Sequence, residues 1–160
     1  MNTAELSLSY KPDDEWCGRL TAAVKAGAFA GQGSAWFDPN HLKDKFVAAL
    51  RAYPLSASEP PKIESGFLSK ENPHVLEQCH LRIIVRPYNS RGTLLVQVDL
   101  ATECHETPDA DQQQSVTARF LTEYPALEKF HIQIPTGFER GGCVSCSVRH
   151  GQRATIRPGT

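Results

Sequence analysis

The clearest pattern in the chain is a strict alternation of apolar and polar residues between positions 81 and 100. The apolar positions are Leu81, Ile83 and Val85 before a short polar segment, and Leu94, Val96, Val98 and Leu100 after it. A period of two is typical of a β-strand with one buried face. Residues 89–92 hold Asn, Ser and Gly, which favour a turn. The sequence therefore predicts a β-hairpin.

The same alternation predicts how the two arms of this hairpin pair. If Tyr88 faces Thr93, all the apolar residues of both arms share one face. On the opposite face, Arg82 then lies across from Asp99. A shift of one residue would set Leu and Val against charged side chains, so the pattern defines a single register.

Five further segments alternate in the same way or carry β-forming residues. We expect strands at 6–10, 19–25, 62–68 and 116–120, and another that runs from the turn at Gly27 to Phe37. Gly31 and Gly33 interrupt that last strand, and a bulge or a close approach of another backbone would explain them.

Two segments have the spacing of amphipathic helices. The first begins at Asp38, a good N-cap residue, followed by Pro39, and its apolar stripe is Leu42, Phe46, Ala49, Leu50 and Tyr53. The second begins near Glu123 with Tyr124, Leu127, Phe130 and Ile134, and Pro135 ends it. The predicted fold is α+β, an antiparallel sheet of about six or seven strands with both helices packed on one face.

Length and composition predict one folded domain followed by a tail. A chain of 160 residues with 40% apolar and 22% charged residues is typical of a globular protein with its own core. Residues 1–135 hold the periodic segments. Residues 136–160 are rich in Gly, Ser, Arg and Cys, and we expect there a basic tail with one short strand near Cys143–Val148.

The charge distribution and the lack of targeting signals limit the classes of partner that we expect. Four of the 17 basic residues lie from Arg140 onward, so residues 1–139 carry 13 against all 18 acidic residues. A nucleic-acid binder normally shows the opposite balance, so we expect no nucleic-acid partner. There is no long apolar run and no signal-like start, which predicts a cytoplasmic protein without a membrane partner. Five cysteines, an odd number, indicate reduced thiols.

Two groups of residues could carry metal or thiol chemistry. Cys143 and Cys146, with His150 close by, have metal-ligand spacing, but they supply only part of a zinc site. Cys104 and His105 offer a thiol and an imidazole in one polar loop, although neighbouring residues of a loop rarely form a nucleophile and base pair. A free-thiol tail and an ordinary solvated loop are the simpler interpretations, and we expect no cofactor.

The polar face of the hairpin is the remaining candidate. With the helices on the other side of the sheet, it would present Arg82, Arg86, Gln97, Asp99 and Arg119, with Ile84, Leu95 and Leu121 among them. A flat face of Arg and aliphatic groups suits a protein partner better than a small substrate. It could equally be a plain solvated surface. His80 is expected on this polar face, in a structural role.

The order of several segments resembles a known family. They are Gly27-Ala28-Phe29-Ala30-Gly31-Gln32-Gly33-Ser34-Ala35-Trp36-Phe37-Asp38, Leu50-Arg51-Ala52-Tyr53-Pro54-Leu55, Arg91-Gly92-Thr93-Leu94, Val98-Asp99-Leu100-Ala101-Thr102 and Phe120-Leu121-Thr122-Glu123-Tyr124. The chain resembles, from Leu6 to Ile134, small uncharacterised bacterial proteins that are themselves similar to WapI-type immunity proteins of polymorphic toxin systems. That resemblance implies a non-enzymatic protein-binding module that neutralises a toxin, and it supplies no catalytic residues. The alternative is a small metal-binding or Cys/His-dependent enzyme that uses Cys104, His105, Cys143 and Cys146.

Overall fold

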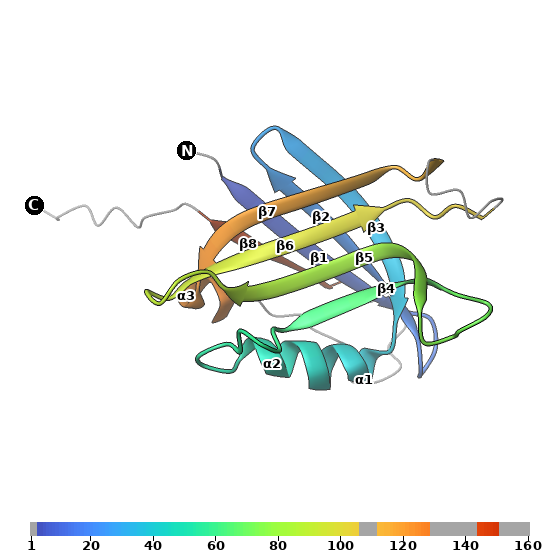
Figure 1. Cartoon of the computed structure of the whole chain (residues 1–160), viewed down its shortest axis with the longest axis horizontal. Coiled ribbons are helices and arrows are strands. Elements are labelled where there is room, and N and C mark those ends of the chain that lie inside the picture. The colour runs from blue at the N-terminus through green and yellow to red at the C-terminus, as the bar shows by residue number, and fades with distance from the viewer. Residues whose placement is uncertain (1–2, 106–111, 129–143, 151–160) are drawn as a thin grey trace, which may run out of the picture.

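Two antiparallel sheets packed face to face form the body of the protein. The computed structural model describes residues 3–105, 112–128 and 144–150 (Figure 1). The first sheet has the strand order β3-β2-β1-β8 and the second β4-β5-β6-β7. The strands are β1 (Ala4–Pro12), β2 (Gly18–Ala26), β3 (Phe29–Phe37), β4 (Lys62–Leu68), β5 (Leu76–Pro87), β6 (Thr93–Ala101), β7 (Ser115–Glu123) and β8 (Val144–His150).

The prediction of a single sheet of six or seven strands is wrong, although the α+β class and the antiparallel pairing are right. The chain forms two four-stranded sheets that cross each other obliquely (Figure 1). Alternation shows which residues face the interior, but the inner faces of both sheets have the same pattern of apolar residues in the sequence. Leu8 and Leu20 of the first sheet and Val98 and Leu100 of the second are all at most 2% exposed. The pattern of burial therefore cannot say which strands pair.

The hairpin prediction is confirmed at each named pair. Leu81 lies opposite Leu100, Ile83 opposite Val98, Val85 opposite Val96 and Arg82 opposite Asp99. The amide of Tyr88 donates to the carbonyl of Thr93 over 2.9 Å. β4 also has the predicted bounds, and the predicted strands at 6–10, 19–25 and 116–120 are each longer by a few residues.

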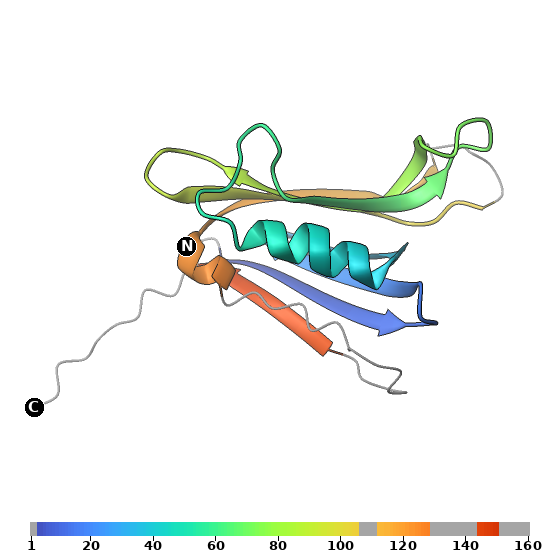
Figure 2. The ribbon, with the colours of Figure 1, turned by 90° about the horizontal axis from the view of Figure 1, so that it is seen from below.

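One helical segment closes the side of the sandwich beside β4. It consists of α1 (Pro39–His41), the π-helical segment η1 (Leu42–Val47) and α2 (Ala48–Leu50). Figure 2 shows that this segment lies between the two layers. Asp38 caps it as predicted, because its carboxylate accepts from the amide of Asn40 over 2.8 Å. Leu42, Phe46 and Leu50 are buried. Tyr53 departs from the predicted stripe and is 80% exposed.

The described part of the second predicted helix is α3 (Tyr124–Glu128). Leu127 is buried as predicted, whereas Phe130 and Ile134 lie outside the described residues. The prediction of helices packed on one face of a single sheet is wrong, because the first helical segment lies between two sheets (Figure 2). None of the helices in the described ranges is long and apolar enough to cross a membrane.

The C-terminal strand belongs to the first sheet. β8 pairs antiparallel with β1 from Tyr10 opposite Val144 to Ala4 opposite His150. The short strand expected near Cys143–Val148 is therefore formed, and it lies at the edge of the sheet. Residues 136–143 and 151–160 of the predicted tail lie outside the described residues.

The glycines of β3 mark a close contact between the sheets. A Cβ on Gly31 would lie 2.2 Å from Cγ1 of Val116, and one on Gly33 would lie 3.1 Å from Cβ of Leu100 and 3.3 Å from the carbonyl oxygen of His80. The pairing of β3 with β2 is regular throughout, without a bulge. A close approach of the other sheet therefore accounts for both glycines.

Candidate functional site

The outer face of the second sheet carries three rows of side chains that run across its strands. The polar row consists of Glu64, Arg82, Asp99 and Thr117, which lie directly opposite one another in β4 to β7. The mixed row beside it consists of Lys62, Ile84, Gln97 and Arg119. The aliphatic row consists of Arg86, Leu95 and Leu121. The register of the sheet alone aligns these rows.

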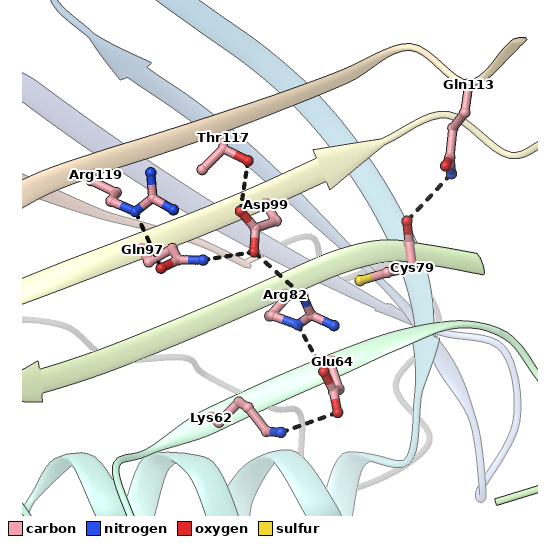
Figure 3. A network of polar contacts seen from close by, with 9 residues as sticks. All are labelled: Lys62, Glu64, Cys79, Arg82, Gln97, Asp99, Gln113, Thr117 and Arg119. Carbon is pink, nitrogen blue, oxygen red and sulfur yellow. Dashed lines mark hydrogen bonds and ion pairs between the residues drawn. The ribbon is translucent and has the colours of Figure 1, made fainter. Parts of the chain in front are cut away.

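Donors and acceptors alternate along the polar row (Figure 3). Arg82 donates from Nε to Glu64 Oε2 over 2.8 Å, and its Nη1 lies 3.7 Å from Asp99 Oδ2. Thr117 donates from Oγ1 to the other oxygen of Asp99 over 2.8 Å. The predicted pair of Arg82 and Asp99 is confirmed, and it is part of a chain that spans all four strands.

The mixed row is bonded to the polar row at two points. The Gln97 amide donates from Nε2 to Asp99 Oδ2 over 3.0 Å, and its Oε1 accepts from Nε of Arg119 over 3.3 Å. Lys62 lies 3.1 Å from Glu64 Oε1. Four of the five predicted face residues therefore belong to one network. The fifth, Arg86, is exposed and has no ion pair within the described part of the chain.

The network changes the pKa of two of its members. Partial burial raises the pKa of Glu64, but hydrogen bonds from Arg82 and Lys62 outweigh it and leave the pKa below its ordinary value. The bond to Glu64 in turn raises the pKa of Arg82. Both groups therefore stay charged at neutral pH, so the face keeps its alternating charges.

A β-bulge changes the face at the start of β5. Ser65 lies opposite Leu81 and Gly66 opposite Cys79, so His80 is the extra residue of β5. His80 is 2% exposed, and the prediction that it lies on the polar face is wrong. Because of the extra residue, His80 faces the interior, although the alternation of β5 would place it on the outer face. A Cβ on Gly66 would lie 1.8 Å from the carbonyl oxygen of Gln78, so the partner strand needs a glycine here.

Packing and hydrogen bonds hold His80 in its buried position. Its ring packs edge-on against Phe67, with the ring centroids 4.5 Å apart, and its Nε2 is hydrogen-bonded to Oε1 of Gln78. Desolvation lowers the pKa of His80. Gln78 also accepts from the amide of Cys104 over 3.0 Å, which ties the loop after β6 to the bulge.

A broad hollow of about 980 Å³ lies where the bulge meets the end of the polar row. Its lining includes Cys79, Arg82, Asp99, Cys104 and His105. The hollow thus joins two groups of residues that the sequence suggested separately, the charged face and the Cys104/His105 loop. Sequence reasoning missed it because it depends on the bulge. Gly66, in the middle of a predicted strand, was the available signal.

The side chains beside Cys104 form a hydrogen-bonded cluster with one ion pair, from Arg19 to Glu103. His105 Nε2 lies 3.1 Å from Glu103 Oε2, and the other oxygen of Glu103 accepts from Arg19 over 2.8 Å. Burial raises the pKa of Cys79, the second thiol at the hollow, which favours the protonated thiol. Within the described residues, no three His, Cys, Asp or Glu side chains are grouped to hold a metal ion.

The predicted metal ligands of the C-terminal region are described only in part. Cys143 lies outside the described residues, and Cys146 and His150 belong to β8, for which only the backbone is described. In the backbone pairing, Cys146 lies opposite Leu8 and His150 opposite Ala4, in the first sheet. A metal site of Cys143, Cys146 and His150 therefore stays a prediction.

Comparisons with protein-family models, with curated proteins and with solved structures find no match to this chain. The site therefore has to be interpreted from its own geometry.

Proposed function

We propose that this protein is a non-enzymatic protein-binding module that uses the outer face of the second sheet. The observation that carries the proposal is the network of the polar and mixed rows. It holds Arg82, Asp99 and Gln97 in place across the strands while Arg86 and the outer nitrogens of Arg119 keep no carboxylate partner within the described residues. Ordered Arg side chains beside aliphatic groups are typical of protein interfaces.

The layout of the face supports a macromolecular partner. It alternates basic residues (Lys62, Arg82, Arg86, Arg119) with acidic ones (Glu64, Asp99, Glu123), and the aliphatic row lies along one side. Such a face offers charge complementarity in both signs, which favours a specific protein surface over a uniformly charged polymer. Neither the described helices nor the first sheet covers it (Figure 2).

The resemblance to WapI-type immunity proteins suggests the class of partner. On that basis the partner is a toxin domain that this protein occludes by binding in a stoichiometric complex. A toxin encoded beside this protein is the first partner to test.

The test compares two charge-reversed variants of equal net charge. The face variant is Arg86→Glu with Arg119→Glu, and the control is Lys43→Glu with Lys45→Glu on the exposed side of the helical segment. Each protein is titrated against the neighbouring toxin domain by calorimetry. We expect one-to-one binding by the wild type and the control, and at least a hundredfold weaker binding by the face variant. Equal binding by all three proteins would contradict the proposed face.

One observation favours a second candidate function. The hollow is lined by Cys79, Cys104 and His105, the residue types that a small metal-binding or Cys/His-dependent enzyme uses, although the described side chains are not grouped to hold a metal ion. Zinc retained through purification, and lost in Cys104→Ser but not in Cys17→Ser, would support this reading. A zinc-free protein that still binds its toxin would reject it.

A further inference from the structure

The free edge of β7 is the more regular of the two edges of the second sheet, as far as the described residues show. β7 ends the second sheet, and its nine residues pair without a register shift with β6. It contains neither Pro nor Gly, which are common protective features of strand edges. The opposite edge, β4, is interrupted by register shifts at Ser65/Gly66 and Phe67/Leu68. β7 is therefore the better template for another strand.

The first sheet extends beyond this edge and leaves an aromatic residue uncovered. Phe29 lies opposite Ala26, whose side chain packs on the core, so Phe29 is on the inner face of the first sheet. Two residues further along β3, Gly31 lies directly under Val116 of β7. Figure 1 shows the β2–β3 hairpin continuing past β7. Phe29 is consequently 70% exposed, where one more strand of the second sheet would cover it.

On the outer side of the same edge, the mixed row ends at a basic group. Arg119 is bonded through Nε to Gln97, and within the described residues no carboxylate lies against its guanidinium. Leu121 follows two residues later on the same face. An added strand would therefore meet a guanidinium and an aliphatic side chain on its outer side, and Phe29 on its inner side.

We propose that β7 receives an extended segment of a protein partner as an additional antiparallel strand. The segment carries an acidic residue opposite Arg119, an aliphatic residue opposite Leu121 and an apolar residue opposite Val116, which covers Phe29. From its N-terminus, the segment reads as aliphatic, any, acidic, any, any, apolar. Strand addition gives affinity through main-chain hydrogen bonds and specificity through alternate side chains. The inference rests on the proposed protein-binding function.

A second copy of this chain fits the edge less well. In the antiparallel register that pairs all nine residues of β7 with another β7, Arg119 lies opposite Arg119, which is repulsive. The register centred on Leu121 matches Arg119 with Glu123, but it pairs only five residues before α3 begins and leaves Phe29 uncovered. A segment from a different protein avoids both faults.

The test is a selection of linear octapeptides displayed on phage against the intact protein. We expect enrichment of the acidic and apolar pattern given above. In fluorescence polarisation, an enriched peptide should bind at least tenfold more weakly to Phe29→Ser and to Arg119→Glu, with little change for Lys43→Glu in the helical segment. Replacing its acidic residue with Lys should restore binding to Arg119→Glu. Phe29 is exposed, so its replacement should leave the fold intact, which circular dichroism verifies.

Three outcomes would overturn the inference. The first is that no peptide pattern is enriched, and the second is that enriched peptides bind Phe29→Ser as tightly as the wild type. The third is a concentration-dependent dimer in sedimentation that Arg119→Glu abolishes. If Arg86→Glu weakens binding of the toxin domain while Phe29→Ser does not, strand addition at β7 is wrong but the proposed function stands. Loss of toxin binding altogether would instead reject the proposed function.

Discussion

The two sheets have matching inner faces and very different outer faces. On the outer side of the first sheet, several central positions of β1, β2 and β3 are small residues, among them Ser7, Thr21, Ala23 and Ser34, while Gln32 lies opposite Ala23. The corresponding positions of the second sheet hold Arg, Asp, Gln and Glu side chains bonded across four strands. Each sheet thus contributes to the core, and among the described side chains the polar network that spans four strands lies on the second sheet (Figure 3).

This contrast separates what the fold requires from what it leaves free. A two-sheet sandwich needs apolar inner positions on both layers, and both layers have them. Long charged side chains lose conformational freedom when they are held in one arrangement. Ser7, Thr21 and Ala23 show that this fold tolerates small residues on the outer side of a sheet, so we relate the network of the second sheet to function.

The prediction with the largest expected effect tests whether the inner faces of the two sheets contribute equally to stability. Leu8→Ala in the first sheet and Leu100→Ala in the second each remove a side chain that is at most 2% exposed. Because both leave a cavity in one shared core, each should lower the free energy of unfolding by about 2–5 kcal/mol. Urea titration followed by circular dichroism measures it. A loss below about 1 kcal/mol for either variant would show that the two sheets do not share a core in this way.

A smaller effect tests the difference between the outer faces. Asp99→Ala leaves Thr117 and Gln97 without their acceptor and should cost about 1–2 kcal/mol of unfolding free energy, since the bonds are partly exposed. Ser7→Ala on the first sheet should change stability by less than about 0.5 kcal/mol. Asp99→Asn, which keeps an acceptor, serves as the matched control in the same urea titration. Equal effects of the two alanine variants would remove the contrast.

The smallest effect concerns the bulge, which only the second sheet has. Burial lowers the pKa of His80 below its ordinary 6.5, so the unfolded chain takes up a proton first as the pH falls. The neutral, buried His80 therefore contributes to the free energy of unfolding fully above pH 6.5, and this contribution is lost as the pH falls toward the pKa of His80 in the folded protein. His80→Gln should flatten the dependence of the unfolding free energy between pH 7 and 5. The control Ser7→Ala, which removes no titratable group, should leave that slope unchanged.

The strands of the fold were largely readable from the sequence. Local alternation determined the hairpin register, from Leu81 opposite Leu100 to Arg82 opposite Asp99, and the local preferences of Asp38 and Pro39 located the start of the helical segment. The division into two sheets was not readable, because alternation says that a residue is buried but not against what. The exposure of Tyr53 followed from the end of the helix before that residue.

The candidate site was readable only in part. Arg82, Gln97, Asp99 and Arg119 were found because they lie on one face of regular strands. The inward turn of His80 and the hollow beside it depend on one extra residue in β5, and a period-two pattern cannot reveal a bulge within it. The exposure of Phe29 was equally hidden, since it results from where the other sheet stops.

The bonded rows also have an entropic consequence. Glu64, Arg82, Asp99, Gln97 and Thr117 already restrict one another's rotamers before any ligand arrives. Immobilising a flexible side chain on binding typically costs about 0.5–1.5 kcal/mol. Most of that ordering is completed when this protein folds, so a ligand that meets this face finds it already arranged.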